Sequence, residues 1–535
     1  MTDTYDYIIA GGGAAGCVLA NRLSADPRNA VLLLEAGPSD KHPFVTMPKG
    51  FGRLLMSDRR TWYLPANPGP TGKNTPETWV RGKMLGGSSS INGMQYLRGH
   101  PEDYDHWERD LGLPGWGWAD MGRIFMAMED HELGATDFRG VGGPLHVIVS
   151  RNRTKIVDAM IAAAEQMGVP HVEEPNLPGQ EGSGYTTATI RHGRRQSAAV
   201  AFLDPVRHRR NLTIVTEAPV DKVRFEGTRA VAVETVEKGV RRTYRAAREI
   251  VLSAGAIMSP AILHRSGVGP EAHLRAIGVP VVRHSPGVGG NMREHVLLFL
   301  QHHLTVDWSQ NREYSGWRLV RNGLRYNLLR TGVLSGPGYD YTGFIRTDPS
   351  LTRPDVQLIA NPLSMDMAAW EGWTKGVTFE KVPGSQIFGY NLLPESQGSV
   401  LARSSDPAEV PEITHNYLSH EKDRRTSVAM FRWMRRMFEQ PAIKPYIKQE
   451  MLPGPQVQSD EDILAAFNML GGPGYHATGT CAMGSVVDAR LRVEGVDGLR
   501  VADLSIFPTN VSGNTNAPAM AAGWRAAELI LDDRR

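Results

Sequence analysis

The sequence predicts an α/β fold, α+β over the whole chain, in which separated segments build a parallel sheet and an antiparallel sheet is inserted between them. A Tyr- and Ile-rich strand is expected at residues 5–9, followed by a glycine-rich turn and a helix. Other buried strands are expected far along the chain, at residues 211–215, 248–252 and 499–503. Strand-like pieces such as residues 356–359 alternate with glycine- and proline-rich turns, which is typical of an antiparallel sheet.

The turn after the first strand has the spacing G-x-G-x-x-G, with Gly11, Gly13 and Gly16. In a Rossmann-like, dinucleotide-binding fold, the first glycine permits the tight turn and the second lets the backbone approach a pyrophosphate. The third allows close packing of helix and strand. A helix beginning at Ala14 and Ala15 would direct its free N–H groups at that pyrophosphate. The alternative is a glycine-rich turn that binds no ligand.

An acidic residue follows the second expected strand, at residues 31–34. Glu35 ends this strand about 20 residues beyond the glycines, where an acid binds a ribose hydroxyl in dinucleotide-binding folds. A carboxylate at this place favours an adenosine with a free 2′-hydroxyl. The motif therefore predicts FAD or NAD rather than NADP.

The composition is that of an ordinary globular protein. The 535 residues can form two or three domains, and 41% of them are apolar while 22% are charged. The formal net charge of +2 indicates no polyanionic partner, so nucleic-acid binding is not expected. Arginine-rich stretches such as residues 241–245 are expected to be solvated loops or helix faces. No spacing typical of metal ligands is visible, so no metal is predicted.

The cysteines and the start of the chain bear on the compartment. Cys17 and Cys481 are the two cysteines, and neither lies in a C-x-x-C motif, so a disulfide framework is not expected. The first strand leaves no room for a signal peptide, and no apolar run of about 18 residues indicates a membrane span. We therefore expect a cytoplasmic protein without a transmembrane span, for which peripheral membrane association stays open.

Two longer motifs resemble those of a known family. Residues 82–93 (GKMLGGSSSING) resemble the first signature of the glucose–methanol–choline (GMC) oxidoreductases, and residues 255–269 (GAIMSPAILHRSGVG) resemble the second. The turn at residues 286–291 (PGVGGN) is also typical of the family. It is followed by Glu294-His295, where the family usually has Asp-His. With the motifs near both ends, the resemblance covers nearly the whole chain.

The resemblance implies FAD as the cofactor. It places the turn at residues 86–88 beside phosphate and ribityl oxygens and residues 92–94 near the isoalloxazine. In some members a histidine just before the signature asparagine holds the flavin covalently, whereas this chain has Ile91 there, so noncovalent FAD is expected. The predicted cofactor-binding residues are Gly11, Gly13, Ala14, Ala15, Gly16, Glu35, Gly86, Gly87, Ser88, Asn92, Gly93, Met94, Val220, Asp503, Thr515 and Asn516.

The blocks of cofactor motifs are separated along the chain, which indicates a cofactor domain interrupted by insertions. We expect residues 1–150, 211–300 and 466–535 to form the FAD-binding domain. Residues 151–210 and 301–465 are expected to form the substrate-binding domain, whose second part is rich in aromatic residues.

Two residues near the carboxyl end are the predicted catalytic pair. His476 matches the family's base, and a neutral imidazole can accept a hydroxyl proton near pH 7. Asn514 matches the second active-site position, where it would donate a hydrogen bond to the substrate oxygen. Backbone N–H groups near Thr515 and Asn516 would stabilise negative charge on the reduced flavin. His295 is the next candidate for the base.

The sequence thus predicts FAD-dependent oxidation of a primary alcohol to an aldehyde, with proton abstraction by His476 and hydride transfer to flavin N5. The aromatic insertion favours an apolar, aromatic or ether-containing alcohol, and the electron acceptor is oxygen or a quinone- or dye-type compound. The main alternative is a hydroxynitrile lyase of the same family, without net redox. A noncatalytic flavin-binding protein and a nicotinamide enzyme are further alternatives.

Overall fold

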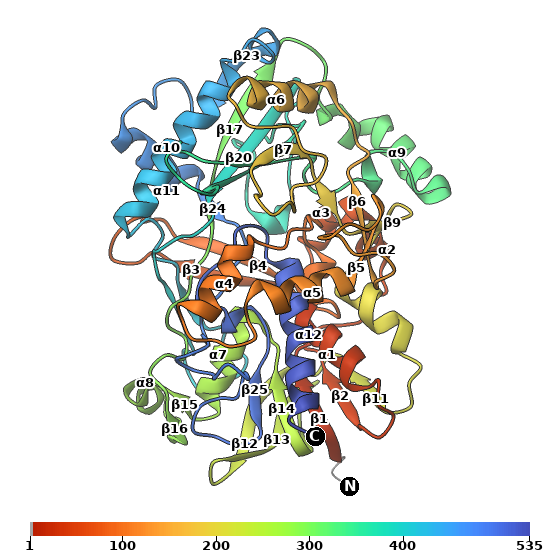
Figure 1. Ribbon diagram of the computed structural model, residues 1–535, viewed down its shortest axis with the longest axis vertical. Coiled ribbons are helices and arrows are strands. Elements are labelled where there is room, and N and C mark those ends of the chain that lie inside the picture. The colour runs from red at the N-terminus through yellow and green to blue at the C-terminus, as the bar shows by residue number, and fades with distance from the viewer. Residues whose placement is uncertain (1–3, 535) are drawn as a thin grey trace.

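Two large sheets lie at opposite ends of the long axis of the molecule in the computed structural model, which describes residues 4–534 (Figure 1). In the lower sheet of Figure 1, β1 pairs in parallel with β2 and β14, and β2 pairs in parallel with β11. The end of β14 also pairs in parallel with β25, while its first half forms antiparallel pairs with β13, which pairs with β12. The strands are β1 (Thr4–Ala10), β2 (Val31–Leu34), β11 (Leu212–Val215), β12 (Val220–Glu226), β13 (Arg229–Glu237), β14 (Val240–Leu252) and β25 (Leu499–Val501).

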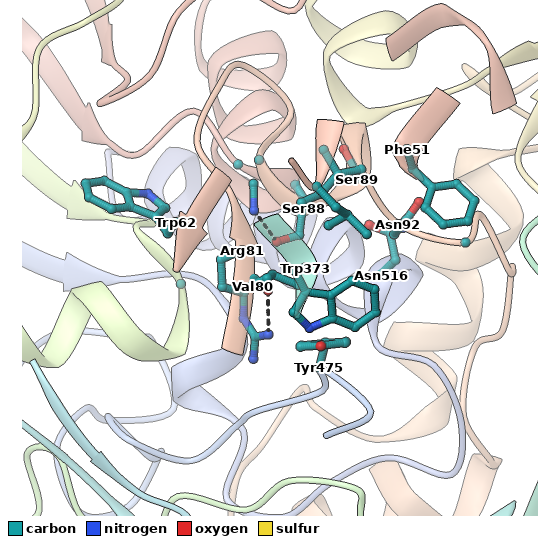
Figure 2. Close-up of a pocket in the computed structure, with 18 of the residues that line it drawn as sticks. Phe51, Trp62, Val80, Arg81, Ser88, Ser89, Asn92, Trp373, Tyr475 and Asn516 are labelled. Atoms are coloured by element: carbon teal, nitrogen blue, oxygen red, sulfur yellow. Dashed lines mark hydrogen bonds between the residues drawn. The ribbon is translucent and has the colours of Figure 1, made fainter. Parts of the chain in front are cut away.

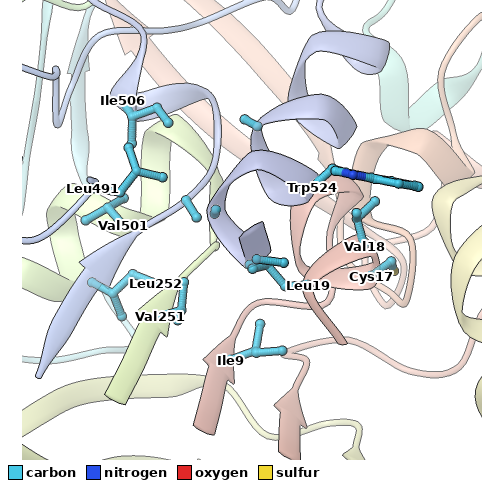
Figure 3. Close-up of a cluster of buried hydrophobic side chains, with 14 of the residues drawn as sticks. Ile9, Cys17, Val18, Leu19, Val251, Leu252, Leu491, Val501, Ile506 and Trp524 are labelled. Carbon is cyan, nitrogen blue, oxygen red and sulfur yellow. The ribbon is translucent and has the colours of Figure 1, made fainter. Parts of the chain in front are cut away.

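The core of this sheet fixes the glycine-rich turn in place. The end of β1 is fully buried, as a central parallel strand should be, and it leads directly into α1 (Ala14–Leu23). Figure 3 shows Ile9 of β1, Leu19 of α1 and Val251 of β14 in one apolar cluster. The long helix α12 (Asn516–Asp532) joins it through Trp524. A Cβ at Gly523 would lie 2.5 Å from the Ala15 carbonyl oxygen, so this glycine allows α12 to approach α1 closely.

The upper sheet in Figure 1 is antiparallel throughout its described pairs and has the order β23-β17-β20-β19-β18-β7, with β24 pairing to β17. The helices α10 (Glu421–Phe438) and α11 (Asp460–Leu470) pack against it. Its strands are β7 (Gly182–Tyr185), β17 (Val296–Leu304), β18 (Tyr341–Ile345), β19 (Val356–Asn361), β20 (Gly384–Asn391), β23 (Ile447–Leu452) and β24 (Gly472–Pro473).

The predicted fold class is confirmed, with a parallel sheet from separated segments and an antiparallel sheet. The strand expected at residues 31–34 has the same bounds as β2, and the one at residues 356–359 extends to Asn361 in β19. The interpretation of residues 241–245 as a loop or helix face is wrong. They lie in β14, where pairing with β13 holds the backbone extended and the arginine side chains stay exposed.

A smaller sheet carries the first family-like segment to the centre of the molecule. β3 (Thr61–Asn67) and β4 (Glu77–Gly82) form an antiparallel pair, and a single turn of 3-10 helix follows at Gly87–Ser90. The second family-like segment forms α7 (Gly255–Arg265), directly after β14. The first segment contacts the glycine-rich turn through the Gly86 N–H, which donates to the Gly12 carbonyl oxygen, and Ser253 and Ala254, directly before the second segment, lie against Gly11. The division into two domains at the predicted boundaries stays a proposal.

Candidate active site

A cavity of about 990 Å³ lies between the two large sheets and is lined by residues from both. Its wall contains every predicted site residue except Gly16 and Gly86. Figure 2 shows part of this wall, where Ser88, Asn92, Tyr475 and Asn516 are labelled. The chain thus brings together residues from its first 35 positions, from residues 87–94 and from residues 476–516.

The first glycine turn leaves the start of α1 open to the cavity. Gly11 has φ +118°, a left-handed conformation that favours glycine, and a Cβ there would overlap the Ser253 carbonyl oxygen. A Cβ at Gly16 would overlap the Gly11 carbonyl oxygen, so Gly16 serves helix–strand packing and not the wall. No side chain caps the helix at Gly13, so the first-turn N–H groups and the positive helix end face the cavity.

Glu35 is buried on the cavity wall and holds the turn. Its two oxygens accept hydrogen bonds from the backbone N–H groups of Gly12, at 2.9 Å, and Gly37, at 2.8 Å. Burial raises the pKa of Glu35, while these hydrogen bonds and the Lys83 ammonium act in the opposite direction. Each carboxylate oxygen has a second lone pair, so Glu35 can still accept a bond from a ribose hydroxyl.

A second glycine turn packs directly on the first. Gly86 has φ +85° and donates its N–H to the Gly12 carbonyl oxygen at 2.7 Å, which places Gly86 behind the wall. A Cβ on Gly87 would lie 2.8 Å from the Cα of Gly13. Ser88 stands on the wall, and its hydroxyl accepts a hydrogen bond from the Gly82 N–H at 3.1 Å. Two turns that allow no side chains between them form a cradle of backbone N–H groups for an anion.

A buried arginine that the sequence did not single out fixes the loop of Asn92. Arg195 is 1% exposed and donates to the side-chain and backbone oxygens of Asn92, both at 2.7 Å. The Asn92 side-chain oxygen also accepts the Met94 N–H at 3.1 Å. Burial lowers the pKa of Arg195 to about 9. The segment from Asn92 through Gly93 to Met94 therefore has a defined orientation along the wall.

The far side of the cradle consists of Asp503, Val220 and the start of α12. Asp503 accepts hydrogen bonds from the Gly255 N–H at 2.9 Å and the Ser259 hydroxyl at 2.6 Å, and burial raises its pKa. Val220 begins β12 and lines the cavity. Thr515 occupies the residue position before the 17-residue helix α12, which begins at Asn516, and its side chain forms no capping hydrogen bond. Both residues line the cavity, so the positive end of α12 also faces it.

His476 lies on the wall, and its protonation is fixed by His295. The Nε2 of His295 lies 2.8 Å from the Leu392 carbonyl oxygen, which can only accept, so Nε2 carries the proton of neutral His295. The Nδ1 of His295 is then an acceptor, and it lies 2.9 Å from Nδ1 of His476. His476 must therefore donate from Nδ1, which leaves its Nε2 unprotonated and able to accept a hydrogen bond.

Asn514 contacts Nε2 of His476 directly, and further hydrogen bonds behind Asn514 fix its orientation. Its amide nitrogen lies 3.0 Å from Nε2 of His476, and its amide oxygen accepts a hydrogen bond from Gln357 at 3.0 Å. The Tyr390 hydroxyl donates to the Gln357 side-chain oxygen. Because each group has a partner of the matching kind, the amide of Asn514 is oriented with its N–H toward His476.

A buried carboxylate supports the backbone of both histidines. Glu294 Oε1 accepts the N–H of His476 at 2.6 Å and the N–H of His295 at 2.9 Å, and Oε2 lies 3.5 Å from Arg81. Burial raises the pKa of Glu294 to about 7, although Arg81 and the two N–H groups lower it. Tyr475, just before His476, has a left-handed φ of +63°.

Both histidines are held neutral near pH 7. Burial, with the neighbouring His295 and Arg81, lowers the pKa of His476 well below its usual value. Burial lowers the pKa of His295 to about 4, although its bond to Leu392 raises it. A neutral imidazole whose unprotonated Nε2 faces a cavity can accept a proton from a bound hydroxyl.

The comparisons with known proteins agree with this geometry. The models of GMC oxidoreductases match residues 5–297, with the amino-terminal model, and residues 394–523, with the carboxyl-terminal model. The chain belongs to the GMC oxidoreductase family. The predicted resemblance is thereby confirmed.

Curated relatives and solved structures cover almost the whole chain of this GMC oxidoreductase. Mitochondrial choline dehydrogenase of Mus musculus is 38% identical and covers 99% of this chain and 89% of its own. An alcohol dehydrogenase (acceptor) of Pseudomonas putida is 37% identical and covers 98% of this chain and 96% of its own. The crystal structure of pyridoxine 4-oxidase from Mesorbium loti has a TM-score of 0.88 at 28% identity, over 99% of both chains.

This GMC oxidoreductase is an FAD-dependent enzyme that acts on alcohols, as the sequence predicts. The residues present fit the cofactor. The two glycine turns and the uncapped end of α1 form a cradle suited to a pyrophosphate, Glu35 suits a ribose, and the uncapped end of α12 suits an anionic ring edge.

Several site residues could not be found from motifs. The sequence predicts His295 only as the next candidate for the base, whereas both of its ring nitrogens are hydrogen-bonded and it does not line the cavity, so its geometry is that of a residue orienting His476. Gln357 and Tyr390 come from the antiparallel sheet, where any of many polar and aromatic residues could have faced the site. The sequence offers one signal for His295, because the Glu294-His295 pair follows the family-like turn at residues 286–291.

Proposed function

We propose that this enzyme oxidises an uncharged primary alcohol to an aldehyde, with His476 as the base. The observation that carries the proposal is the unprotonated Nε2 of His476 on the cavity wall, whose tautomer is fixed by His295 and which accepts a hydrogen bond from Asn514. Bound FAD supplies a hydride acceptor at N5.

In this mechanism, the alcohol hydroxyl replaces the Asn514 amide as the hydrogen-bond donor to Nε2 of His476, and the alcohol proton then passes to that atom. The imidazolium that results keeps its Nδ1–H bond to His295, so the ring does not need to turn. The Asn514 amide donates a hydrogen bond to the substrate oxygen as negative charge develops there. The Glu294 carboxylate, bonded to the His476 N–H, partly compensates the new positive charge.

The cofactor-binding roles are proposed for the residues that the sequence predicts. The turns at residues 11–16 and 86–88 would bind the pyrophosphate and ribityl chain, with Asp503, and Glu35 would bind the ribose. Residues 92–94 and 515–516 would flank the isoalloxazine, and Val220 would meet the adenine. We propose noncovalent FAD because Ile91, which is 6% exposed and lines the cavity, has no nucleophilic atom.

The character of the remaining wall supports an apolar, aromatic or ether-containing substrate. We call the lining residues of segments 44–56 and 314–388 the distal wall. Its aromatic members are Phe44, Phe51, Tyr314, Tyr339, Trp373, Phe379 and Phe388. Aromatic rings give large apolar contact areas and the occasional hydroxyl for an ether or hydroxyl oxygen.

The charges of the distal wall favour an uncharged alcohol over choline. Among the described residues, its charged members are Lys49, Arg53 and Lys375, and none is acidic. A quaternary ammonium gains from aromatic faces, but the distal wall offers it no carboxylate and places Arg53 and Lys375 beside it, while Glu409 lines the cavity outside this wall. We therefore propose that choline, the substrate named for several relatives, is a poor substrate here.

The alternative is a lyase that cleaves cyanohydrins in the same cavity without net redox. An anaerobic panel of benzyl alcohol, 1-octanol, 2-butoxyethanol and choline, scored by loss of flavin absorbance, separates the two. We expect bleaching by the first three, little by choline, and recovery of the colour on admission of oxygen or a quinone-type dye. If no alcohol bleaches the flavin and mandelonitrile is cleaved, the lyase is the correct function.

A further inference from the structure

The helix α9 (Gly316–Leu329) has an unusual distribution of apolar residues. The described part of the chain has thirteen large apolar residues that are exposed, and five of them lie on this one helix. They are Trp317, Val320, Leu324, Leu328 and Leu329, with exposed fractions of 67%, 64%, 60%, 79% and 67%. Exposed apolar residues are normally scattered singly, so a cluster on one helix indicates a surface that is covered by a partner.

Trp317, Val320, Leu324 and Leu328 follow one another at intervals of three, four and four residues, which places them in a single stripe. The opposite side of the helix is the one that meets the protein. Asn322 and Tyr326 are buried there, and the Tyr326 hydroxyl donates to the Thr46 carbonyl oxygen at 3.3 Å. The helix thus packs through polar groups and turns its apolar stripe outward, at the periphery of the molecule in Figure 1.

The charges along α9 are basic. The helix contains Arg318, Arg321 and Arg325, Arg330 caps its end, and none of its 14 residues is acidic. Arg321 lies over the Trp317 ring, with 5.1 Å between guanidinium and ring centre. Glu313, which precedes the helix, pairs with Arg318 and Arg321. An apolar stripe that starts at a tryptophan and is bordered by arginines is the pattern of a helix lying in an anionic lipid interface.

The same helix also borders the cavity. Leu319, Gly323 and Asn327 line it, and Asn327 is exposed, as are the lining residues Phe44 and Met56. The cavity therefore reaches the surface beside α9. Residues 316–329 fall between the two regions matched by the family models, so this helix is not part of what identifies the family.

We propose that α9 docks the enzyme peripherally on an anionic lipid bilayer, with the entrance of the cavity close to the membrane surface. Among residues 4–534, no helix has both the length and the apolar content to cross a bilayer. An apolar alcohol or a lipid-soluble quinone concentrated in the bilayer would then reach the cavity directly. The docking itself does not depend on the proposed substrate.

The test is flotation of the purified holoenzyme with vesicles of phosphatidylcholine, with and without phosphatidylglycerol. We expect the enzyme to float with the anionic vesicles and much less with pure phosphatidylcholine. The double variant Leu324→Glu/Leu328→Glu should lose about 10-fold or more of this binding. The matched control, Leu111→Glu/Val240→Glu, changes two exposed apolar residues elsewhere and should float like the wild type.

Flavin reduction by a soluble alcohol should stay normal in both variants, because neither Leu324 nor Leu328 lines the cavity. Failure of flotation with normal flavin reduction would overturn the membrane docking and leave the proposed function intact. Equal flotation of the stripe variant and the control would also overturn it. Light scattering that showed a wild-type dimer split by the stripe variant would assign the stripe to a second copy of the chain instead.

Discussion

The Nδ1 atoms of His476 and His295 lie 2.9 Å apart, and the proton between them belongs to His476. His295 has its own proton on Nε2, where it donates to the Leu392 carbonyl oxygen. The carbonyl thus determines, through one imidazole, that the other imidazole presents an unprotonated Nε2 to the cavity. In the other tautomer, the neutral imidazole would carry its proton on Nε2 and could not accept the alcohol proton there.

Removal of this acceptor should slow flavin reduction without releasing FAD. In His295→Leu, the Nδ1–H of His476 has no partner and the tautomer is no longer fixed, so we expect reduction about 10- to 100-fold slower. His295→Asn, which can place an amide oxygen near the Nδ1 position, should recover part of the rate. Anaerobic stopped-flow gives both rates, and an unchanged rate in the leucine variant would remove His295 from the mechanism.

Glu294 should make the stability depend on pH. Its pKa is raised in the folded protein from 4.5 to about 7, so the folded state holds a proton that the unfolded state has released between these values. Stability from this group is therefore lost as pH rises from about 4.5 to 7. Glu294→Gln, which keeps the shape, should flatten that part of the curve. Denaturant unfolding of the holoenzyme at pH 5 and pH 8 measures the difference between the two proteins.

The acid that follows the second strand should matter for retention of the cofactor. Glu35→Ala should weaken FAD binding by about 10- to 100-fold, since a charged hydrogen bond is worth about 1.5–3 kcal/mol. Glu35→Gln, which keeps one acceptor for the N–H groups of Gly12 and Gly37, separates the turn from the ribose contact. Fluorescence titration of apoprotein with FAD gives the affinities. Equal affinity in the wild type and both variants would place the ribose elsewhere.

The attachment of the cofactor has a direct assay. With Ile91 at the position where some relatives carry a tethering histidine, acid precipitation should release intact FAD into the supernatant. Yellow colour that stays with the pellet would show a covalent bond at another residue.

The glycine turns of this site can be recognised in the sequence, whereas the partners of His476 and Asn514 cannot, for physical reasons. The turns at Gly11 and Gly87 admit no side chain, so their glycines are dictated by local geometry and can be read from spacing. His476 and Asn514 also sit in short motifs. Their partners are Gln357, which lies in β19 of the antiparallel sheet, and His295, which directly precedes β17 of that sheet. Nothing local in the sequence specifies which face of this sheet meets the cavity.

The same distinction explains α9. Its apolar residues have helical spacing, and spacing alone predicts a face that is buried in the protein. Only the three-dimensional structure shows that Leu324 and Leu328 point outward while Asn322 and Tyr326 point inward. A sequence pattern fixes which residues share a face of a helix, but not whether protein or another surface covers it.

The role of His476 as the base is the central claim, and the most direct test is the anaerobic rate of flavin reduction at saturating alcohol in His476→Ala. We expect the variant to retain FAD and to be reduced about 10²–10⁴-fold more slowly than the wild type. Asn514→Ala, which removes one hydrogen-bond donor, should lose less. Near-normal reduction in His476→Ala, or a larger loss in the Asn514 variant, would contradict the assignment of the base to His476.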